Sequence, residues 1–174
     1  MTTIARLQEY VSRQAERRPE AVAVVMKGVT RTYGELEAES NRLARALRAA
    51  GCRPGDRVGF LLPKSPQAVV AMLAILKADG VYVPIDVDNP AARVRKIVQA
   101  SEPRVLLGSG AAAARLDALA AGAHWPSPRI GWLDDAEWSG EHVRPAFDAS
   151  DLASLSAEAS SGAPSVAASF WAAS

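Results

Sequence analysis

Apolar residues along this chain fall into short continuous runs separated by longer stretches with helical spacing. The runs at 21–26, 57–62 and 104–107 have the length of strands, and a shorter strand candidate lies at 129–133. Runs that are apolar at consecutive positions are typical of strands buried on both faces. We therefore expect an α/β fold with a mainly parallel sheet and helices on both faces.

Between these runs, apolar residues recur every three or four positions, which predicts helices. An amphipathic helix is expected at 4–18, ending before Pro19, and further helices are expected at 67–78, 91–101 and 111–121. The helix at 67–78 is apolar on nearly every side, so we expect it to lie in the interior.

One further helix has both of its ends marked in the sequence. Thr32 and Glu35 have the spacing of a capping box, in which each side chain accepts a hydrogen bond from the other residue's backbone amide. Gly51 suits the left-handed residue that closes a helix. We predict a helix between these two signals.

Proline and glycine mark the other boundaries. Ser65-Pro66 and Asn89-Pro90 each predict an N-cap followed by a proline in the first helical turn. Lys27-Gly28 predicts a tight turn that joins the run at 21–26 to a second strand at 29–32. Tyr82-Val83 predicts a short strand that stops before Pro84.

Composition and charge exclude several classes of function. Twenty Lys and Arg residues against nineteen Asp and Glu give a net charge of +1, and the basic residues are scattered, so we expect no nucleic-acid partner and no membrane surface. The longest apolar stretch, 68–76, is about half of the ~20 residues that cross a bilayer. The N-terminus lacks the apolar core of a secretory signal, and the single cysteine, Cys52, is interpreted as a small, partly buried hydrophobe. We expect a cytoplasmic protein.

Candidate chemical groups are few. His124 and His142 lack the spacing of metal ligands, so solvated loop positions explain them better. Lys64 and Lys77 read as surface lysines whose alkyl chains lie on apolar neighbours. The indoles in the later part of the chain are expected to cover a sheet edge: Trp125, Trp132 and Trp138. We assign no catalytic, cofactor-binding or metal-binding residue.

Four segments resemble one family when they are taken together and in order. Thr32 to Leu36, Leu61 to Pro66, Leu76 to Asp86 and the stretch from Pro90 to Leu107 are similar to the N-terminal part of the adenylate-forming ligases. The resemblance is to amino-acid adenylation domains of nonribosomal peptide synthetases. It covers about the first two-thirds of the chain and fades beyond about Gly108.

Most of these motif residues also have a structural explanation. Thr32 to Leu36 is explained by a capped helix start, and Tyr82 to Asp86 by a strand end, a proline and an acid that turns the next segment. Asp79 stands where the family usually has glycine, and we expect the following Gly80 to end the helix.

The resemblance implies an activity for a complete family member. Such enzymes use ATP and Mg²⁺ to convert a carboxylic acid to an acyl-adenylate and pyrophosphate, and then pass the acyl group to a thiol. The thiol belongs to the phosphopantetheine of a carrier protein or to coenzyme A. We expect residues 1–150 to form the N-terminal subdomain of such a ligase, truncated, and residues 151–174, which are rich in Ala and Ser, to form a disordered tail.

The expected tail differs from the family's phosphate loop, which resembles Thr-Ser-Gly-Ser-Thr-Gly-x-Pro-Lys-Gly. This chain has Asp151-Leu152-Ala153 as a lead-in and then Ser160 to Pro164, but Ser165 occupies the lysine position. A loop without that lysine would bind triphosphate poorly. We therefore expect no cofactor in this chain, and as its partner the remainder of the adenylation domain or a carrier protein.

Two alternatives stay open. One is a non-catalytic interaction or subunit module that assembles with a complementary chain carrying the ATP site, with an exposed apolar patch as its signature. The other is independent nucleotide binding on turns at Gly28 or at Gly108 to Gly110, which lack any fingerprint spacing.

Overall fold

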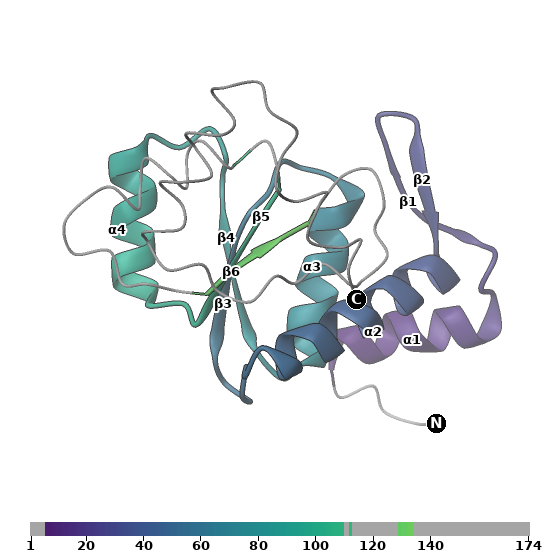
Figure 1. Ribbon diagram of the computed structural model, residues 1–174. Coiled ribbons are helices and arrows are strands. Elements are labelled where there is room, and N and C mark those ends of the chain that lie inside the picture. The colour runs from purple at the N-terminus through teal and green to yellow at the C-terminus, as the bar shows by residue number, and fades with distance from the viewer. Residues whose placement is uncertain (1–5, 110–111, 113–128, 134–174) are drawn as a thin grey trace, which may run out of the picture.

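The computed structural model describes residues 6–109, 112 and 129–133 (Figure 1). Within these ranges helices alternate with strands, as the apolar pattern predicts. The elements, in chain order, are α1 (Leu7–Arg17), β1 (Val22–Met26), β2 (Val29–Thr32), α2 (Tyr33–Ala49), β3 (Arg57–Leu61), α3 (Pro66–Lys77), β4 (Val81–Ile85), α4 (Ala91–Ser101), β5 (Val105–Gly108) and β6 (Arg129–Trp132).

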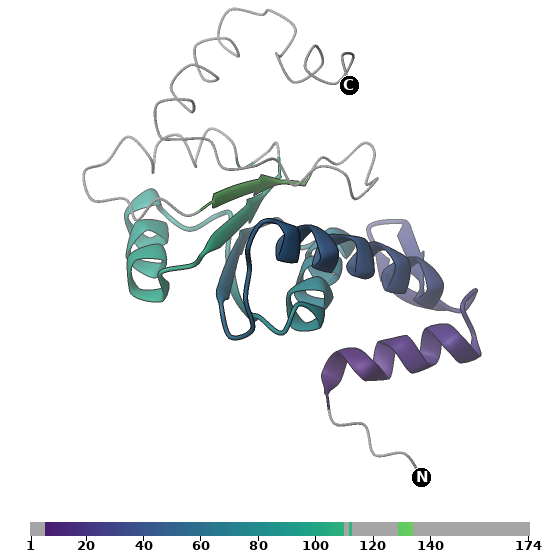
Figure 2. The same ribbon diagram turned by 60° about the horizontal axis from the view of Figure 1, so that its bottom comes forward.

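The larger sheet is parallel and has the strand order β4-β3-β5-β6. From β3 the chain crosses through α3 to β4 on one side, and from β4 it crosses back through α4 to β5 on the other side of β3. Because crossovers between parallel strands are right-handed, opposite directions of travel place α3 and α4 on opposite faces of the sheet (Figure 2). The predicted α/β fold with helices on both faces is confirmed.

Side chains of β3 alternate between two core clusters, one on each face of the sheet. Val58 and Phe60 pack with residues of α2 and α3, whereas Leu61 packs with Val94 and Val98 of α4. A strand buried on both faces must be apolar at consecutive positions, which explains the continuous run in its sequence.

Helix α3 has the interior position that its sequence predicts. Ser65 is its N-cap, with the hydroxyl accepting from the amide of Ala68 at 3.2 Å, and Pro66 stands in the first turn. The helix buries residues toward α2 and the sheet, and Val70 and Leu73 belong to a third cluster that also contains Leu36 of α2. The predicted N-cap and the predicted burial are both confirmed.

The predicted capping box of α2 is also present. The Thr32 hydroxyl accepts from the amide of Glu35 at 3.2 Å, and the Glu35 carboxylate accepts from the amide of Thr32 at 2.7 Å. At the other end, Gly51 has a φ of +88°, and the amide of Cys52 donates to the carbonyl of Leu47 at 3.0 Å. Both predicted ends of this helix are confirmed.

Strands β1 and β2 form an antiparallel hairpin that stands beside α2 (Figure 1). Lys27 and Gly28 both have positive φ, 49° and 81°, as a two-residue hairpin turn requires. The register shifts between Val22 and Val24, and this irregularity lets Ala23 and Val24 both pack on the cluster around Leu36 of α2. The predicted turn is confirmed.

The prediction that a strand stops before Pro84 is wrong. Strand β4 runs through Pro84, which lies opposite Phe60 of β3, and ends at Ile85. Within the described residues β4 pairs only with β3, so it is an edge strand there. A proline fits an edge strand because the amide that it lacks would point away from the sheet.

Two predicted helix ends also differ from the structure. Pro90 itself is the N-cap of α4, without a side-chain cap hydrogen bond, because a turn that begins at Asp86 places Asn89 and Pro90 outside the helix. At the end of α3, Asp79 takes the left-handed conformation, with a φ of 60°, and Gly80 does not. Gly80 serves close approach instead, since a Cβ there would lie 3.1 Å from the carbonyl oxygen of Asp56.

The remaining predictions concern the two ends of the chain. The opening helix is confirmed as α1, one residue short of the predicted end, and β6 confirms the strand candidate at 129–133. The predicted helix at 111–121 and the predicted disordered tail at 151–174 lie outside the described residues. In the described part of the chain, no helix is long and apolar enough to cross a bilayer.

Candidate functional site

The carboxyl ends of the parallel strands form the first candidate site. The connection after β3 leads toward β4, whereas β5 is followed by β6 on the opposite side, so the direction of travel reverses between β3 and β5. In open parallel sheets, ligands bind outside the carboxyl ends of the strands at such a reversal. The residues that follow β3, β4 and β5 are therefore the first to consider.

Two of these residues have a polar side chain close to the reversal. Lys64 follows β3 and is exposed, as the sequence predicts. Ser109 follows β5 and is only 2% exposed, and within the described part of the chain its hydroxyl has no hydrogen-bond partner. A buried hydroxyl without a partner is unusual, because most buried polar groups are hydrogen-bonded. Sequence reasoning named this serine only as part of the turn from Gly108 to Gly110, the alternative nucleotide site without fingerprint spacing.

Asp86, at the end of β4, has the structural role that the sequence predicts. Its carboxylate accepts from the amide of Asp88 at 2.9 Å, and its carbonyl oxygen accepts from the amide of Asn89 at 3.1 Å. These two bonds form the turn that leads into α4. The carboxylate and the carbonyl oxygen of Asp86, the last residue of the family-like motif, are therefore both used in hydrogen bonds that form a turn.

The described residues at this edge include no cluster of metal-ligating side chains. A triphosphate requires a cradle of backbone amides with a cation, and Mg²⁺ requires carboxylate oxygens that are available for coordination. Within residues 6–109, 112 and 129–133, no group of three or more His, Cys, Asp or Glu side chains could hold a metal ion. The loop-like stretch Ser160 to Ser165 lies outside the described residues, as do His124 and His142.

The second candidate is a polar cluster where α1, α2 and α3 meet. Lys77 of α3 is 2.8 Å from the carboxylate of Glu37 of α2 and donates to the side-chain oxygen of Asn41 at 2.9 Å. The same carboxylate accepts from the hydroxyl of Ser12 of α1 at 2.9 Å and from the side-chain amide of Asn41 at 3.0 Å. One carboxylate therefore links three helices.

Lys77 was predicted to be a surface lysine, and this prediction is wrong. Its side chain is only 9% exposed, because α1 and α2 enclose the last turn of α3. Burial opposes ionisation of Glu37, but hydrogen bonds from Lys77, Asn41 and Ser12 outweigh it and lower the pKa of that carboxyl. The signal in the sequence is a lysine at the end of a helix that is apolar on nearly every side.

A cavity of about 550 Å³ lies beside this cluster and is lined by Arg6, Arg45, Arg48 and Asp79, among others. Its charged groups are largely paired with one another. Arg6 lies 2.5 Å from the Asp79 carboxylate, and Arg48 donates to the carbonyl oxygen of Lys77. Cations at the carbonyl end of α3 are stabilised by the helix dipole. These contacts hold α1 and α2 at the end of α3.

Cys52 has no chemical role in this arrangement. It is buried in the core cluster of α2, α3 and the sheet, as predicted for a small hydrophobe. The described residues thus provide two features: the carboxyl edge of the parallel sheet, and a structural polar cluster where α1, α2 and α3 meet. In the polar cluster the Ser12 hydroxyl does meet the Glu37 carboxylate, and this hydrogen bond joins α1 to α2.

Comparison with known proteins shows which family this fold belongs to. The family model described as AMP-binding enzyme matches residues 11–161, which extends beyond the region in which the sequence motifs are recognisable. Tyrocidine synthase 3 of Brevibacillus parabrevis is 42% identical over 106 residues, covering 61% of this chain and 2% of that protein. Malpinin synthetase of Mortierella alpina is 43% identical over 110 residues, covering 63% of this chain and 1% of that protein.

Solved structures agree with this relationship. A nonribosomal peptide synthetase, FmoA3, bound to alpha-methyl-L-serine-AMP, has a TM-score of 0.64 and 33% identity, covering 80% of this chain and 15% of that one. The N-terminal domain of FACL13 from Mycobacterium tuberculosis has a TM-score of 0.71 and 27% identity, covering 83% of this chain and 38% of that one. The chain spans only a small part of the synthetases it matches. It belongs to the AMP-binding enzymes, the adenylate-forming ligases, and is similar to the adenylation domains of nonribosomal peptide synthetases.

Proposed function

We propose that this chain supplies the N-terminal wall of an amino-acid-activating adenylation unit. In that unit an amino acid and ATP form an aminoacyl-adenylate and pyrophosphate, and the aminoacyl group then passes to a carrier-protein thiol. The observation that supports this most directly is the likeness to a synthetase holding an aminoacyl-AMP, which covers 80% of this chain. We place the reaction in the cytoplasm, in the synthesis of a peptide secondary metabolite.

We further propose that the chain does not activate an amino acid by itself. Ser165 stands where the family's phosphate loop has a lysine, and the described residues include no group of three or more acidic, His or Cys side chains that could hold a metal ion. ATP and Mg²⁺ would then be held by a complementary polypeptide. The described sheet and helices would position that polypeptide without contacting the reacting atoms.

Amino-acid-dependent exchange of pyrophosphate into ATP tests both statements. The purified chain is assayed alone, and then together with the polypeptide encoded downstream, against a panel of amino acids. We expect no exchange by the chain alone and exchange by the mixture. Exchange by the chain alone would overturn the need for a partner, and no exchange by the mixture would overturn assembly with that polypeptide.

A chimera tests the structural role without knowledge of the natural partner. Residues 11–109 of this chain replace the equivalent residues of tyrocidine synthase 1, which is 40% identical over 101 residues. We expect the chimera to keep adenylation of the parent's amino acid. A chimera that folds, as judged by its unfolding transition, but has lost exchange would contradict the proposed role of this region.

A second candidate function is a non-catalytic assembly module, and the hairpin favours it. Val22 and Val25 of β1 are 55% and 67% exposed, whereas Ala23 and Val24 pack inward. Exposed apolar side chains on one strand suit contact with another polypeptide. If this function holds without catalysis, Val25→Thr will weaken co-purification with the complementary chain, and the mixture will show no exchange.

A further inference from the structure

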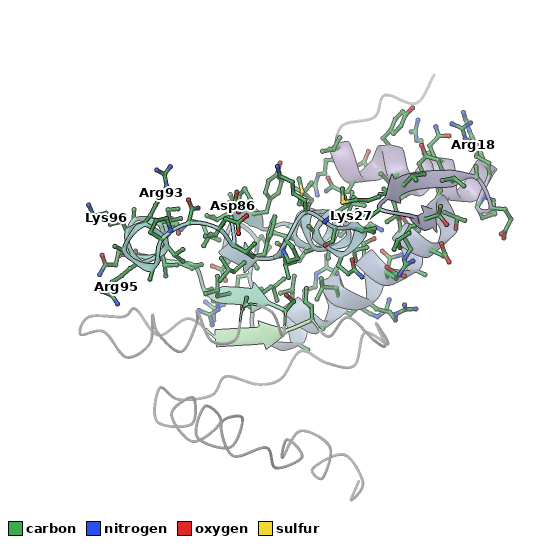
Figure 3. All side chains as sticks on the ribbon, turned by 90° about the horizontal axis from the view of Figure 1, so that it is seen from above. Arg18, Lys27, Asp86, Arg93, Arg95 and Lys96 are labelled. Carbon is green, nitrogen blue, oxygen red and sulfur yellow. The ribbon has the colours of Figure 1, made fainter. Side chains whose placement is uncertain are left out.

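Helix α4 carries a group of cations that its own fold does not explain. Arg93, Arg95 and Lys96 lie within four positions, and Ala91–Ser101 contains no acidic residue. Figure 3 shows their side chains extending outward from α4 at one end of the molecule. Arg93 and Lys96 are exposed, and Arg95 is partly buried.

These cations do not stabilise the helix locally. Arg93 lies in the first turn, where the positive end of the helix dipole disfavours a cation. In the part of the chain that the structure describes, none of the three forms a salt bridge. The Nε of Arg95 is buried and has no hydrogen-bond partner among the described residues. A basic surface with this arrangement is suited to an acidic polypeptide.

The sequence of the same chain contains such a polypeptide. Residues 134–158 carry seven acidic side chains against one basic side chain, Arg144. The whole chain has a net charge of +1, so the rest of the chain carries the compensating positive charge. The acidic residues are Asp134, Asp135, Glu137, Glu141, Asp148, Asp151 and Glu158.

The end of β6 leaves this segment within reach of α4. Strands β4 and β6 are parallel members of one sheet, so Trp132 and the turn before α4 lie at the same edge. Three strand spacings of ~4.8 Å separate β6 from β4, or about 15 Å. Five residues at ~3.3 Å each cover that distance, and the acidic segment is several times longer.

We propose that the basic face of α4 is a docking surface for an acidic polypeptide, and that its occupant is the segment 134–158 of the same chain. Carboxylates of this segment pair with Arg93 and Lys96. The pairing covers a helix that would otherwise present unpaired cations to solvent.

Zero-length cross-linking of the full chain tests the proposal. A carbodiimide joins a lysine amine to a carboxylate only when the two are in contact, and mass spectrometry of the monomer identifies the joined peptides. We expect Lys96 to be joined to an acid of 134–158. Lys96→Arg keeps the charge and removes the amine, so this product should vanish, whereas Lys27→Arg at the hairpin turn, labelled in Figure 3, should leave its yield unchanged.

Charge reversal provides the second test. Arg93→Glu leaves the Lys96 amine in place and should lower the yield of the Lys96 product at least about threefold, as should ~0.5 M salt, because screening weakens exposed pairs. Equal yields from Lys96 and Lys27, or an unchanged yield in Arg93→Glu, would overturn docking on α4. A product found only in the covalent dimer would overturn the assignment to the same chain and indicate a second copy as the occupant.

Discussion

Helices α3 and α4 cover opposite faces of one sheet but are held in place in different ways. Helix α3 has a side-chain N-cap, buries residues on several sides and ends in a cluster of paired charges. Helix α4 has no side-chain cap and buries only Val94 and Val98. The difference shows that α1 and α2 are held against α3 by polar and apolar contacts. Helix α4 contributes only one apolar stripe to the fold, and residues on its opposite side are exposed.

The largest expected effect comes from removing a large side chain from α3. Ile75 is fully buried in the main core cluster, so Ile75→Ala should lower the free energy of unfolding by about 3 to 4 kcal/mol through lost burial and a residual cavity. Ile97→Ala on α4 should cost about half as much, because Ile97 is only partly buried. Urea unfolding of both variants measures the difference, and equal costs would contradict the contrast between the helices.

The next effect concerns the charge that links three helices. Lys77→Met should cost about 2 kcal/mol, since it leaves the Glu37 carboxylate partly buried without its cation. Lys64→Met, at an exposed position, should change stability by less than about 0.5 kcal/mol. Chemical denaturation of the two variants tests the assignment of Lys77 to the interior. Similar small effects would show that Lys77 behaves as a surface lysine after all.

A smaller effect is expected at the start of α3. Ser65→Ala removes the hydroxyl that accepts from the amide of Ala68 and should cost about 1 kcal/mol. Ser65→Asp keeps an accepting oxygen and should recover most of that loss. Thermal unfolding distinguishes the two variants, and a loss as large in Ser65→Asp as in Ser65→Ala would show that the cap is not the cause.

The smallest effect is the pH dependence of the same three-helix link. The pKa of Glu37 is lowered in the folded protein, so its ionised form contributes stability above about pH 4.5 that is lost as the pH falls further. Burial raises the pKa of Glu39, so protonation of Glu39 acts in the opposite direction. Glu37→Gln should therefore flatten the acid limb of the stability profile, and Glu39→Gln should steepen it. Profiles that change in the same direction would contradict these assignments.

Local signals were enough to predict most of α2 and α3. The capping box at Thr32 and the N-cap at Ser65 depend on residues three positions apart, so short stretches of sequence contain all the information. The hairpin turn at Lys27-Gly28 is local in the same sense. Each of these predictions is confirmed without reference to the rest of the fold.

Predictions failed where the result depends on distant packing. Pro84 could be placed inside a strand only once β4 was known to lie at the edge of the described sheet. Lys77 could be placed in the interior only once α1 and α2 were seen to enclose it. Asp79 takes the left-handed position, whereas Gly80 allows close approach to Asp56, a contact between segments more than twenty residues apart. The partnerless Ser109 hydroxyl likewise has no counterpart in the pattern of the sequence.

Pro84 also bears on how copies of this chain behave at high concentration. An edge strand offers free amides and carbonyls to any strand that approaches, which is a common start of aggregation and domain swapping. Pro84, the fourth of the five residues of β4, removes one donor from that edge, and an added strand would meet a gap in its hydrogen bonds. Within the described sheet, the residue that interrupts the sequence pattern therefore disfavours the pairing of another strand with β4.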